Sequence, residues 1–234
     1  TDYQSLIPKI LAEKKVKAVA PFISSKVGIS TEDQTDGIII RGILPSAEEK
    51  VTDLKRNLRA GSFNLERENP ESSPKILLGA TLADRLNVKI GSTVIIYSLK
   101  GSNLTSGTMP KVSKFKVGGI FETGMYEYDS SLGYISLGEA QKLFNLENSV
   151  TGLEVKIDNF YEAQTVAKQI EKNLGPDFLA IDWMQMHKNL FSWMSLEKYA
   201  MFLALSLIVA VAAFNIISTL IMIVLEKKKE IGIL

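Results

Sequence analysis

The sequence has no cysteine and only one histidine among its 234 residues. The absence of cysteine excludes disulfide bonds, cysteine metal sites and thiol nucleophiles. Any Ser-His-Asp triad would need His187, and neither a G-x-S-x-G nor an H-E-x-x-H motif accompanies that residue. His187 lies between Trp183 and Trp193, the only two tryptophans, in a pattern that favours packing at a membrane surface over catalysis or metal binding.

Signals for nucleotide and nucleic-acid binding are also missing. No G-x-x-x-x-G-K-[ST] phosphate-binding loop is present, and 27 basic residues balance 26 acidic ones without a basic stripe. The acidic segment FETGMYEYDSS contains Glu122, Glu127 and Asp129, but clustered acids in a loop usually cap turns or face solvent. The sequence therefore predicts no catalytic residue, no cofactor and no metal site, and we expect that the chain is not itself an enzyme.

One long charge-free run dominates the C-terminal fifth of the chain. Residues Tyr199 to Leu225 contain no Asp, Glu, Lys or Arg, and their number exceeds the threshold of about 18 apolar residues for a membrane span. At about 1.5 Å per residue the run forms a helix of about 40 Å, against a hydrocarbon core of about 30 Å. The sequence predicts a transmembrane helix over 199–225 that tilts or protrudes.

The residues that flank this run indicate its orientation. Lys227, Lys228 and Lys229 follow the run, whereas Lys198 alone stands close before it. Because lysine enrichment marks the cytoplasmic side, residues 226–234 are expected in the cytoplasm and the larger N-terminal part outside it. The chain starts at Thr1 without a signal-peptide pattern and stops as a new apolar segment begins, so we expect more protein at both ends.

Small and polar residues inside the run favour contacts with other membrane helices. Polar groups in lipid usually face neighbouring helices, and small residues allow helices to approach closely. The residues expected to pack in this way are Ala210, Ala212, Ala213, Asn215, Ser218 and Thr219.

The part that precedes the membrane segment, residues 1–184, has the pattern of an α+β domain rather than a regular βαβ repeat. Helices are expected at 2–15, 47–58, 80–86, 138–144 and 160–174, and strands at 16–29, 37–44, 75–78, 91–98, 114–121, 133–137, 152–157 and 178–183. The polar segment 61–74, with two prolines, is expected to be a loop.

Two connecting segments carry functional hypotheses. Residues 99–113 (LKGSNLTSGTMPKVS) join two expected strands and exceed the usual hairpin turn of about 2–5 residues, so they predict an extended β-hairpin. Long ordered loops are often functional. Residues 185–198 contain no Gly or Pro and predict a stalk helix continuous with the membrane helix, acting either as a mechanical link between the two sides or as a simple anchor.

The run LSLIVAVAAFNIISTLIMIVLEKKKEIGIL (205–234) resembles the second transmembrane helix and the following cytoplasmic segment of the LolC/LolE family, the permeases of the bacterial lipoprotein-releasing ABC transporter. The resemblance extends to VAPFI, ILLGATLADRLNVKIGSTVII, KFKVGGIFETGMYEYDSSLGYISLGEAQKLF and TGLEVKI, and so covers nearly the whole chain. It implies a MacB-like periplasmic core domain between the first two of four transmembrane helices, in the bacterial inner membrane.

The resemblance also implies partners. These are a separate LolD-like ATPase, a second permease subunit in a hetero- or homodimer, a lipoprotein substrate and a LolA-like periplasmic chaperone. Residues 226–234 would begin the region that couples to the ATPase, with Glu226, Lys227 and Glu230 as contacts. The long hairpin would be the hook that grips the chaperone, with Val112 and Ser113 standing where basic and amide residues are expected. The hook residues implied are Lys100, Gly107, Met109, Pro110, Lys111 and Lys114.

Two other functions fit the same layout. A MacB-type efflux or mechanotransmission permease shares the domain plan but normally carries its ATPase on the same chain. An extracytoplasmic sensor with a signalling helix would be followed by a kinase module in place of further transmembrane helices.

Overall fold

Strand β1 (Val16–Ser30) organises the N-terminal part of the protein in the computed structural model, which describes residues 3–67, 69–98 and 111–231. The first half of β1 pairs antiparallel with β8 (Gly152–Ile157). Its second half pairs antiparallel with β2 (Thr35–Ile43), and its last residues pair with β5 (Thr93–Ser98). One strand of 15 residues thus holds three neighbours.

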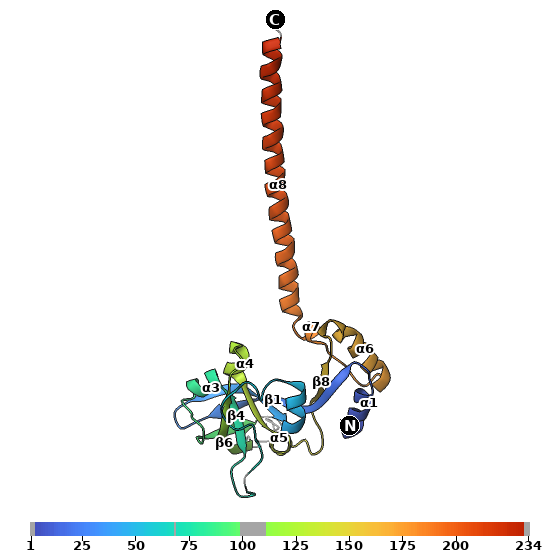
Figure 1. Ribbon diagram of the computed structural model, residues 1–234. Coiled ribbons are helices and arrows are strands. Elements are labelled where there is room, and N and C mark those ends of the chain that lie inside the picture. Colours follow the sequence, from blue (N-terminus) through green and yellow to red (C-terminus); the bar gives the residue numbers. More distant parts are fainter. Residues whose placement is uncertain (1–2, 68, 99–110, 232–234) are drawn as a thin grey trace, which may run out of the picture. The chain divides into compact units, whose positions relative to one another are not determined.

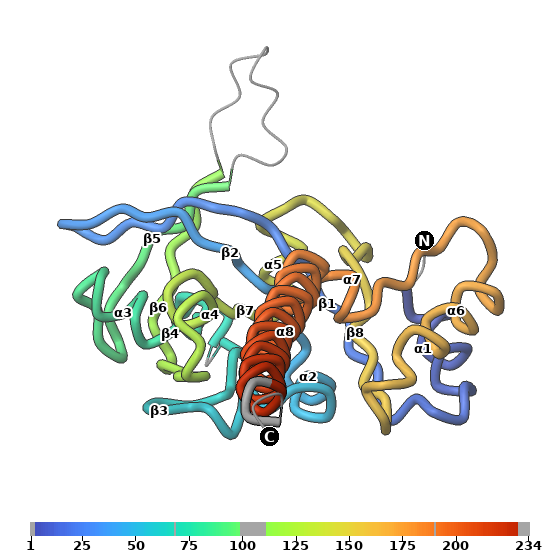
Figure 2. Tube along the Cα trace, turned by 90° about the horizontal axis from the view of Figure 1, so that it is seen from above, coloured from blue at the N-terminus to red at the C-terminus, as the bar shows by residue number. Residues whose placement is uncertain are grey.

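The remaining pairings close a ring of six strands. β2 runs parallel to β7 (Leu132–Ser136), which pairs antiparallel with β4 (Lys75–Gly79). β4 runs parallel to β6 (Lys111–Phe121), and β6 pairs antiparallel with β5. Because β1 pairs with both β5 and β2, the order β1-β2-β7-β4-β6-β5 returns to its start. Figure 1 labels β1, β4 and β6 of this ring, and Figure 2 labels all six strands. The short β3 (Leu58–Gly61) extends β6 on the outside, as β8 extends β1.

Short helices lie around these strands. Figure 2 labels α1 to α6 on a trace that is coloured along the sequence. Helix α5 shows why its sequence is helical: Ser136 caps its start by accepting a hydrogen bond from the Glu139 amide, and Asn145 ends it in the left-handed conformation. The helices of this part are α1 (Tyr3–Leu11), α2 (Pro45–Val51), α3 (Ala80–Arg85), α4 (Tyr126–Ser131), α5 (Leu137–Phe144), the 3₁₀ helix η2 (Phe160–Glu162) and α6 (Ala163–Leu174).

The main core combines inward-facing strand residues with the apolar faces of α3 and α5. Phe115 on β6 and Ile40 on β2 are fully buried, and Leu82 and Leu143 join them from the two helices. A second cluster contains Phe121 and Tyr134, whose rings meet edge to face with centroids 5.2 Å apart. The apolar, β-branched runs in the sequence become strands because their side chains fill these two clusters.

The acidic segment after β6 forms a capped turn and a short helix. The buried Asp129 carboxylate accepts hydrogen bonds from the Thr123 amide at 2.8 Å and the Gly124 amide at 3.0 Å. Gly79 lies so close to the Asp129 backbone that an added Cβ would stand 2.2 Å from its carbonyl oxygen. The expectation that these acids cap a turn is confirmed for Asp129, although the sequence did not predict helix α4.

Several expected boundaries in this part differ from the structure. The helix expected at 47–58 ends at Val51, and β3 lies partly within the segment expected as a loop. The strand expected at 178–183 is wrong, because residues 178–182 have no regular secondary structure and Trp183 begins a helix. The other expected strands and helices are confirmed within a few residues.

The chain divides into two compact units, Thr1–Leu179 and the C-terminal unit Ala180–Leu234. The C-terminal unit contains the short helix α7 (Trp183–Met186) and the long helix α8 (Lys188–Ile231). The Asp182 carboxylate caps α7 by accepting from the Met184 and Gln185 amides at 2.8 and 2.9 Å. His187 then leaves the helical conformation, with φ −107° and ψ 32°. The helix expected to run continuously from Met184 therefore breaks once, and the uninterrupted helix begins at Lys188.

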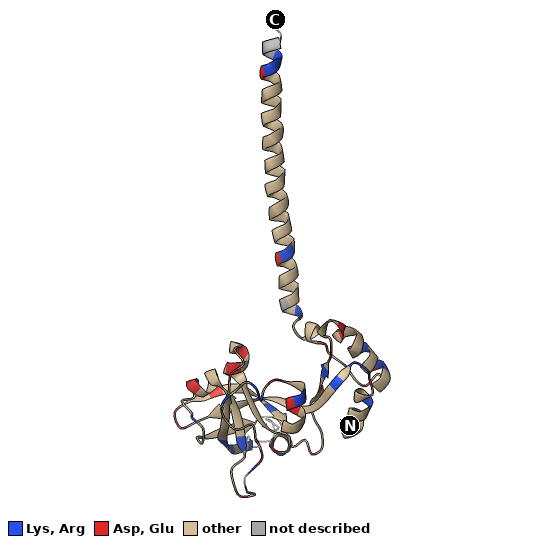
Figure 3. Cartoon of the chain, viewed as in Figure 1, with Lys and Arg blue, Asp and Glu red and all other residues tan. Residues whose placement is uncertain are grey.

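Helix α8 is long and apolar enough to cross a membrane. It has 44 residues, and its span from Phe191 to Lys228 passes the criteria of length and composition without any part being buried inside the chain. In Figure 3 the ribbon of α8 is coloured for charged residues toward both ends and for uncharged residues along the stretch between them. It is the one such helix among the residues that the structure describes.

Candidate functional site

The base of the predicted hook is an antiparallel pair of strands. Tyr97 on β5 stands opposite Val112 on β6, and Ser98 stands opposite Lys111. The two strands expected to carry the hairpin therefore pair as predicted. Because β6 starts at Lys111, residues 111–113 belong to the strand and not to the loop. The predicted hook residues Lys100, Gly107, Met109 and Pro110 lie outside the described residues.

The outward face of this base is basic. Alternation along β6 places Phe115 inside the ring, whereas Lys114 and Lys116 are exposed. Lys75 on β4 stands beside Lys116, which adds a third ammonium group to this face. In the described ranges no carboxylate forms an ion pair with Lys114 or Lys116. The face is suited to contact an acidic or carbonyl-rich surface.

Lys111 has a different surrounding from Lys114. Its Nζ donates a hydrogen bond to the Lys142 carbonyl oxygen near the end of α5. This contact ties the returning strand of the hairpin to α5. Both residues are exposed, but Lys111 is tied to α5, although the same role was predicted for both.

A cluster of ionisable groups joins the ring to β8. On β2 the Arg41 Nη2 lies 2.5 Å from the Oε2 of Glu154 on β8. The Arg41 guanidinium also stacks over the Phe22 ring of β1, 4.7 Å from its centroid. Burial lowers the pKa of Arg41, but Glu154, Tyr134 and Glu48 together outweigh this effect and leave the pKa raised. Arg41 is therefore held charged between two strands that do not pair with each other.

Glu48 on α2 adds a second carboxyl to this cluster. It is fully buried, and its Oε1 accepts a hydrogen bond from the Thr52 hydroxyl at 3.1 Å. Its Oε2 has no hydrogen-bond partner among the described residues. Burial, followed by repulsion from Glu154, raises the pKa of Glu48, although Arg41 and Thr52 act against the rise. Burial also raises the pKa of Tyr134, beside Arg41 on β7, to about 12.

The sequence analysis missed this cluster. Its members come from five elements, so no motif brings them together. One signal was present: Glu48 follows Ala47, which packs with Val51 against β1. A glutamate at the edge of an apolar helix face is a candidate for burial. Neither in this cluster nor in the rest of the described part of the chain do three His, Asp or Glu side chains gather in a way that could hold a metal ion.

The predicted packing residues of α8 do not share one face. At about 100° per residue, Ala212, Ser218 and Thr219 lie within about 60° of Asn215 around the helix axis. Ala210 and Ala213 lie about 140° to 160° from Asn215, on the opposite side. The Thr219 hydroxyl donates to the Asn215 carbonyl oxygen at 2.9 Å and so satisfies itself within the helix. The six residues offer two surfaces, not one.

The predicted coupling residues lie on the last turns of α8. Glu226 and Lys227 continue the helix beyond the apolar run, and Glu230 is also helical, with a side chain outside the described part. The helix does not end where the charge-free run ends. Any partner that meets these residues therefore meets a helical surface.

Similarities to known proteins cover both units of the chain. The chain matches the MacB-like periplasmic core domain family over residues 1–173. It is 33% identical, over its full length, to the lipoprotein-releasing system transmembrane protein LolC of Neisseria meningitidis serogroup B, of which it covers 56%. LolC of Xylella fastidiosa is 33% identical, with 55% of that protein covered. LolE of Haemophilus influenzae is 23% identical over 99% of the chain and 55% of its own length.

The chain spans about half the length of these curated relatives. The family match covers α1 to α6, including the ring of strands and the base of the predicted hook. The similarity to LolC continues beyond it through α7 and α8. The chain therefore belongs to the MacB-like periplasmic core domain family and, within it, to the LolC/LolE transmembrane proteins.

Proposed function

We propose that this chain is part of the permease subunit of an ABC transporter that extracts lipoproteins from the bacterial inner membrane and passes them to a periplasmic chaperone. One observation carries the proposal. The 33% identity to a LolC protein extends over the whole chain, and so includes both the strand ring and the membrane helix. A shared periplasmic domain alone would fit other permeases, but similarity through α8 favours the lipoprotein-releasing class.

In this proposal each part of the chain lies in a different compartment. The unit of residues 1–179 lies in the periplasm, α8 crosses the membrane between Tyr199 and Leu225, and Glu226 begins the cytoplasmic end. The three lysines at 227–229 support this orientation. ATP hydrolysis belongs to a separate LolD-like subunit that meets the end of α8 near Glu226, Lys227 and Glu230. The chain itself is not an enzyme.

The two surfaces of α8 support assembly with more than one membrane helix. The side around Asn215 carries a side-chain amide that can hydrogen-bond to a neighbour, and the side with Ala210 and Ala213 permits close packing. A lone anchor would need neither surface. Within the proposal, one neighbour belongs to a second permease subunit, either LolC-like, LolE-like or an identical copy.

The hairpin between β5 and β6 is proposed as the hook for a LolA-like chaperone. Its strands are fixed in the ring on both sides, since β5 pairs with β1 and β6 pairs with β4. A rigid base of this kind reduces the entropy that its own residues lose on binding. Lys114 and Lys116 on the basic face are available for ionic contacts that also speed association.

A pull-down with a purified LolA-like chaperone tests the hook. The full chain in detergent micelles is compared with Pro110→Ala, with a variant that shortens the 101–112 loop, and with Lys114→Glu/Lys116→Glu. Capture is expected to fall most for the shortened loop and to fall in a salt-dependent way for the double charge change. Lys168→Glu on the exposed face of α6 is the matched control. Unchanged capture by the shortened loop would refute the hook assignment.

A further inference from the structure

The segment that precedes the charge-free run exposes large apolar side chains. We call residues 181–198 the pre-membrane segment. Trp193 is 71% exposed, Met186 68%, Leu196 60% and Met194 56%. In water each such side chain forgoes the favourable free energy that burial would give. A contiguous apolar surface of this kind on a chain marks contact with another phase or partner.

The pre-membrane segment has a defined local structure within the C-terminal unit. Asp182 caps α7 and is itself buried. The Trp183 ring of α7 meets the Phe191 ring of α8 edge to face, with centroids 5.1 Å apart. Together with the break at His187, these contacts fold α7 back on the first turns of α8. The exposed side chains therefore lie next to a bend between α7 and α8 that these contacts stabilise.

The apolar side chains of the first turns of α8 do not form a stripe. Trp193 lies about 200° around the helix from Phe191, and Leu196 lies about 140° from Phe191. Met194 lies about 60° from Phe191 on the other side, so these four apolar side chains are spread over an arc of about 220°. Polar residues occupy the remaining sector. A single protein partner covers one side of a helix and would leave part of this arc in water. A wide apolar arc beside a polar sector suits a medium that surrounds the helix and offers both apolar and polar contacts.

The composition of the segment matches the membrane interface. Trp side chains concentrate at the level of the lipid headgroups because they combine an apolar body with one polar group. Lys188 and Lys198 add positive charge, and lysine side chains reach from the apolar boundary to the headgroups. Against them stands one exposed acid, Glu197, since Asp182 is engaged in the α7 cap.

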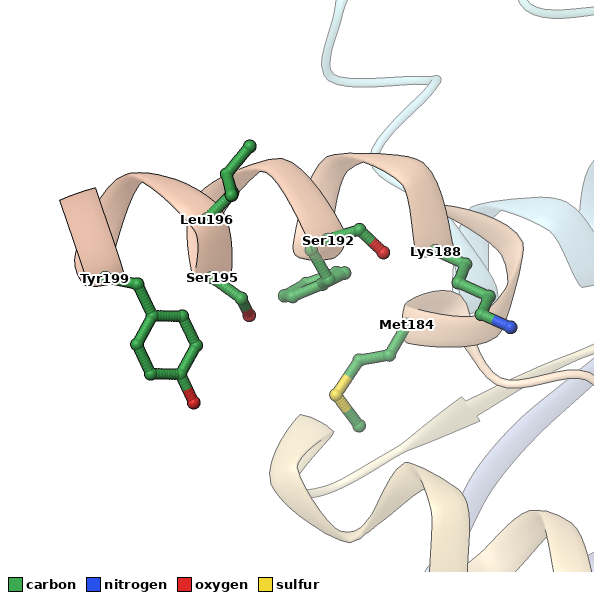
Figure 4. Close-up of a pocket in the computed structure, with 7 residues that line it drawn as sticks. Met184, Lys188, Ser192, Ser195, Leu196 and Tyr199 are labelled. Atoms are coloured by element: carbon green, nitrogen blue, oxygen red, sulfur yellow. The ribbon is translucent and has the colours of Figure 1, made fainter.

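Polar groups of this segment also line a shallow groove. Lys188, Ser192, Ser195 and Tyr199 occur at helical spacing, and Figure 4 shows Ser192, Ser195 and Tyr199 of α8 on the same side as Met184 of α7. Hydroxyl and ammonium donors along an otherwise apolar groove can bind the phosphate and glycerol oxygens of a phospholipid. The groove lies directly above the charge-free run.

Length considerations agree with a tilted helix. The run 199–225 is about 40 Å long, and the hydrocarbon core is about 30 Å thick. An upright helix would lift the pre-membrane segment beyond the headgroups and leave its tryptophan in water. Tilting shortens the height of the run and brings these first turns to the headgroup level.

We propose that the pre-membrane segment lies in the headgroup region of the bilayer, with its groove against phospholipid headgroups, and so is not a stalk surrounded by water. The inference rests on the proposed membrane span of α8, but it does not depend on the transported substrate.

The two native tryptophans test the proposal because both lie in this segment. The full chain is reconstituted in vesicles of phosphatidylcholine with a minor share of phosphatidylglycerol. Trp183→Phe and Trp193→Phe each leave one reporter. Quenching by lipids that carry a nitroxide near the headgroup is expected to exceed quenching by lipids labelled deep in the acyl chain, for both reporters. Aqueous acrylamide is expected to quench both reporters less than it quenches free tryptophan.

Two outcomes overturn the proposal. Full access of acrylamide with no lipid quenching means that the segment stands in water, and protection from both quenchers means that protein covers it. Phe214→Trp in a background without the native tryptophans reports on the middle of the span and should be quenched by the deep label. If the Phe214→Trp reporter is quenched but the native ones are not, the present inference alone fails. If the Phe214→Trp reporter is also unquenched, the membrane span of the proposed function fails.

Discussion

The strand ring and helix α8 use similar apolar residues in opposite surroundings. In the ring Phe121 is fully buried among other side chains, whereas on α8 Phe214 is 70% exposed. Apolar side chains of the ring leave water when the domain folds, which is the main source of its stability. Those of α8 are exposed among the residues that the structure describes and would face lipid or other helices, where burial between helices gains little hydrophobic free energy. The same residue type therefore carries different functions in the two regions.

The largest expected effect on stability comes from a cavity in the strand ring, which the same substitution on α8 would not create. Phe121→Ala removes a ring from a fully buried site and should lower the free energy of unfolding by about 3–5 kcal/mol. Phe214→Ala on α8 removes the same ring and should leave the unfolding of the domain unchanged. Urea unfolding of the full chain in detergent, followed by circular dichroism, measures both. Equal destabilisation by the two variants would contradict the comparison.

Introducing a charge into α8 tests the comparison through its effect on membrane insertion. Val211→Arg places a guanidinium in the middle of the charge-free run and should cost about 2.5–3.5 kcal/mol in membrane insertion. Val112→Arg places the same charge on an exposed strand position at the hairpin base and should be tolerated. Resistance of the membrane-bound protein to alkaline extraction reports on insertion. If Val211→Arg inserts as well as the parent chain, α8 does not face lipid there.

Within the domain, the buried charge cluster should matter more than surface ion pairs. Glu154→Gln leaves Arg41 without its ionic partner and should cost about 1–2 kcal/mol, less than a fully buried pair because both side chains keep some exposure. Asp158→Asn removes the exposed Lys17–Asp158 pair and should change stability by less than about 0.5 kcal/mol. Chemical unfolding of both variants at neutral pH gives the comparison, and equal effects would count against a structural role for the cluster.

The smallest expected effect depends on pH. The pKa of Glu48 is raised in the folded state, so the folded protein resists its ionisation and loses stability as pH rises through that pKa. Glu48→Gln cannot ionise and should stabilise the domain at pH 8, with the gain vanishing below about pH 4. Melting temperatures from circular dichroism at several pH values measure the gain. Glu66→Gln at an exposed position is the control, and a gain that is independent of pH would contradict the assigned cause.

The elements that the sequence predicts best depend on local pattern. The β-branched runs that became β1 and β5 end at serine, and Pro45 closely follows the run that became β2. The charge-free run of α8 needs only length and composition. Strand β3 escaped prediction because its four residues alternate only weakly. The strand expected at 178–183 fails because Asp182 provides a helix cap, which outweighs the apolar pattern before it.

The candidate sites divide in the same way. The paired strands β5 and β6 beneath the proposed hook could be predicted, because apolar and polar residues alternate along them. The cluster around Arg41 could not, because it depends on tertiary contacts between strands that are distant in sequence. The six packing residues of α8 were chosen by type. Their angular positions, which separate Ala210 from Asn215, follow from helical periodicity and were available in the sequence.

The closure of the strand ring also constrains how the domain folds. β1 must pair with β8 and β2 must pair with β7, and in both cases the partner comes from the second half of the chain. Pairing across such sequence distances slows folding, and until β7 arrives one edge of β2 stays open to other strands. A free strand edge is an aggregation hazard, so the closed ring that leaves no such edge on β2 in the finished domain also makes the assembly of that domain slow.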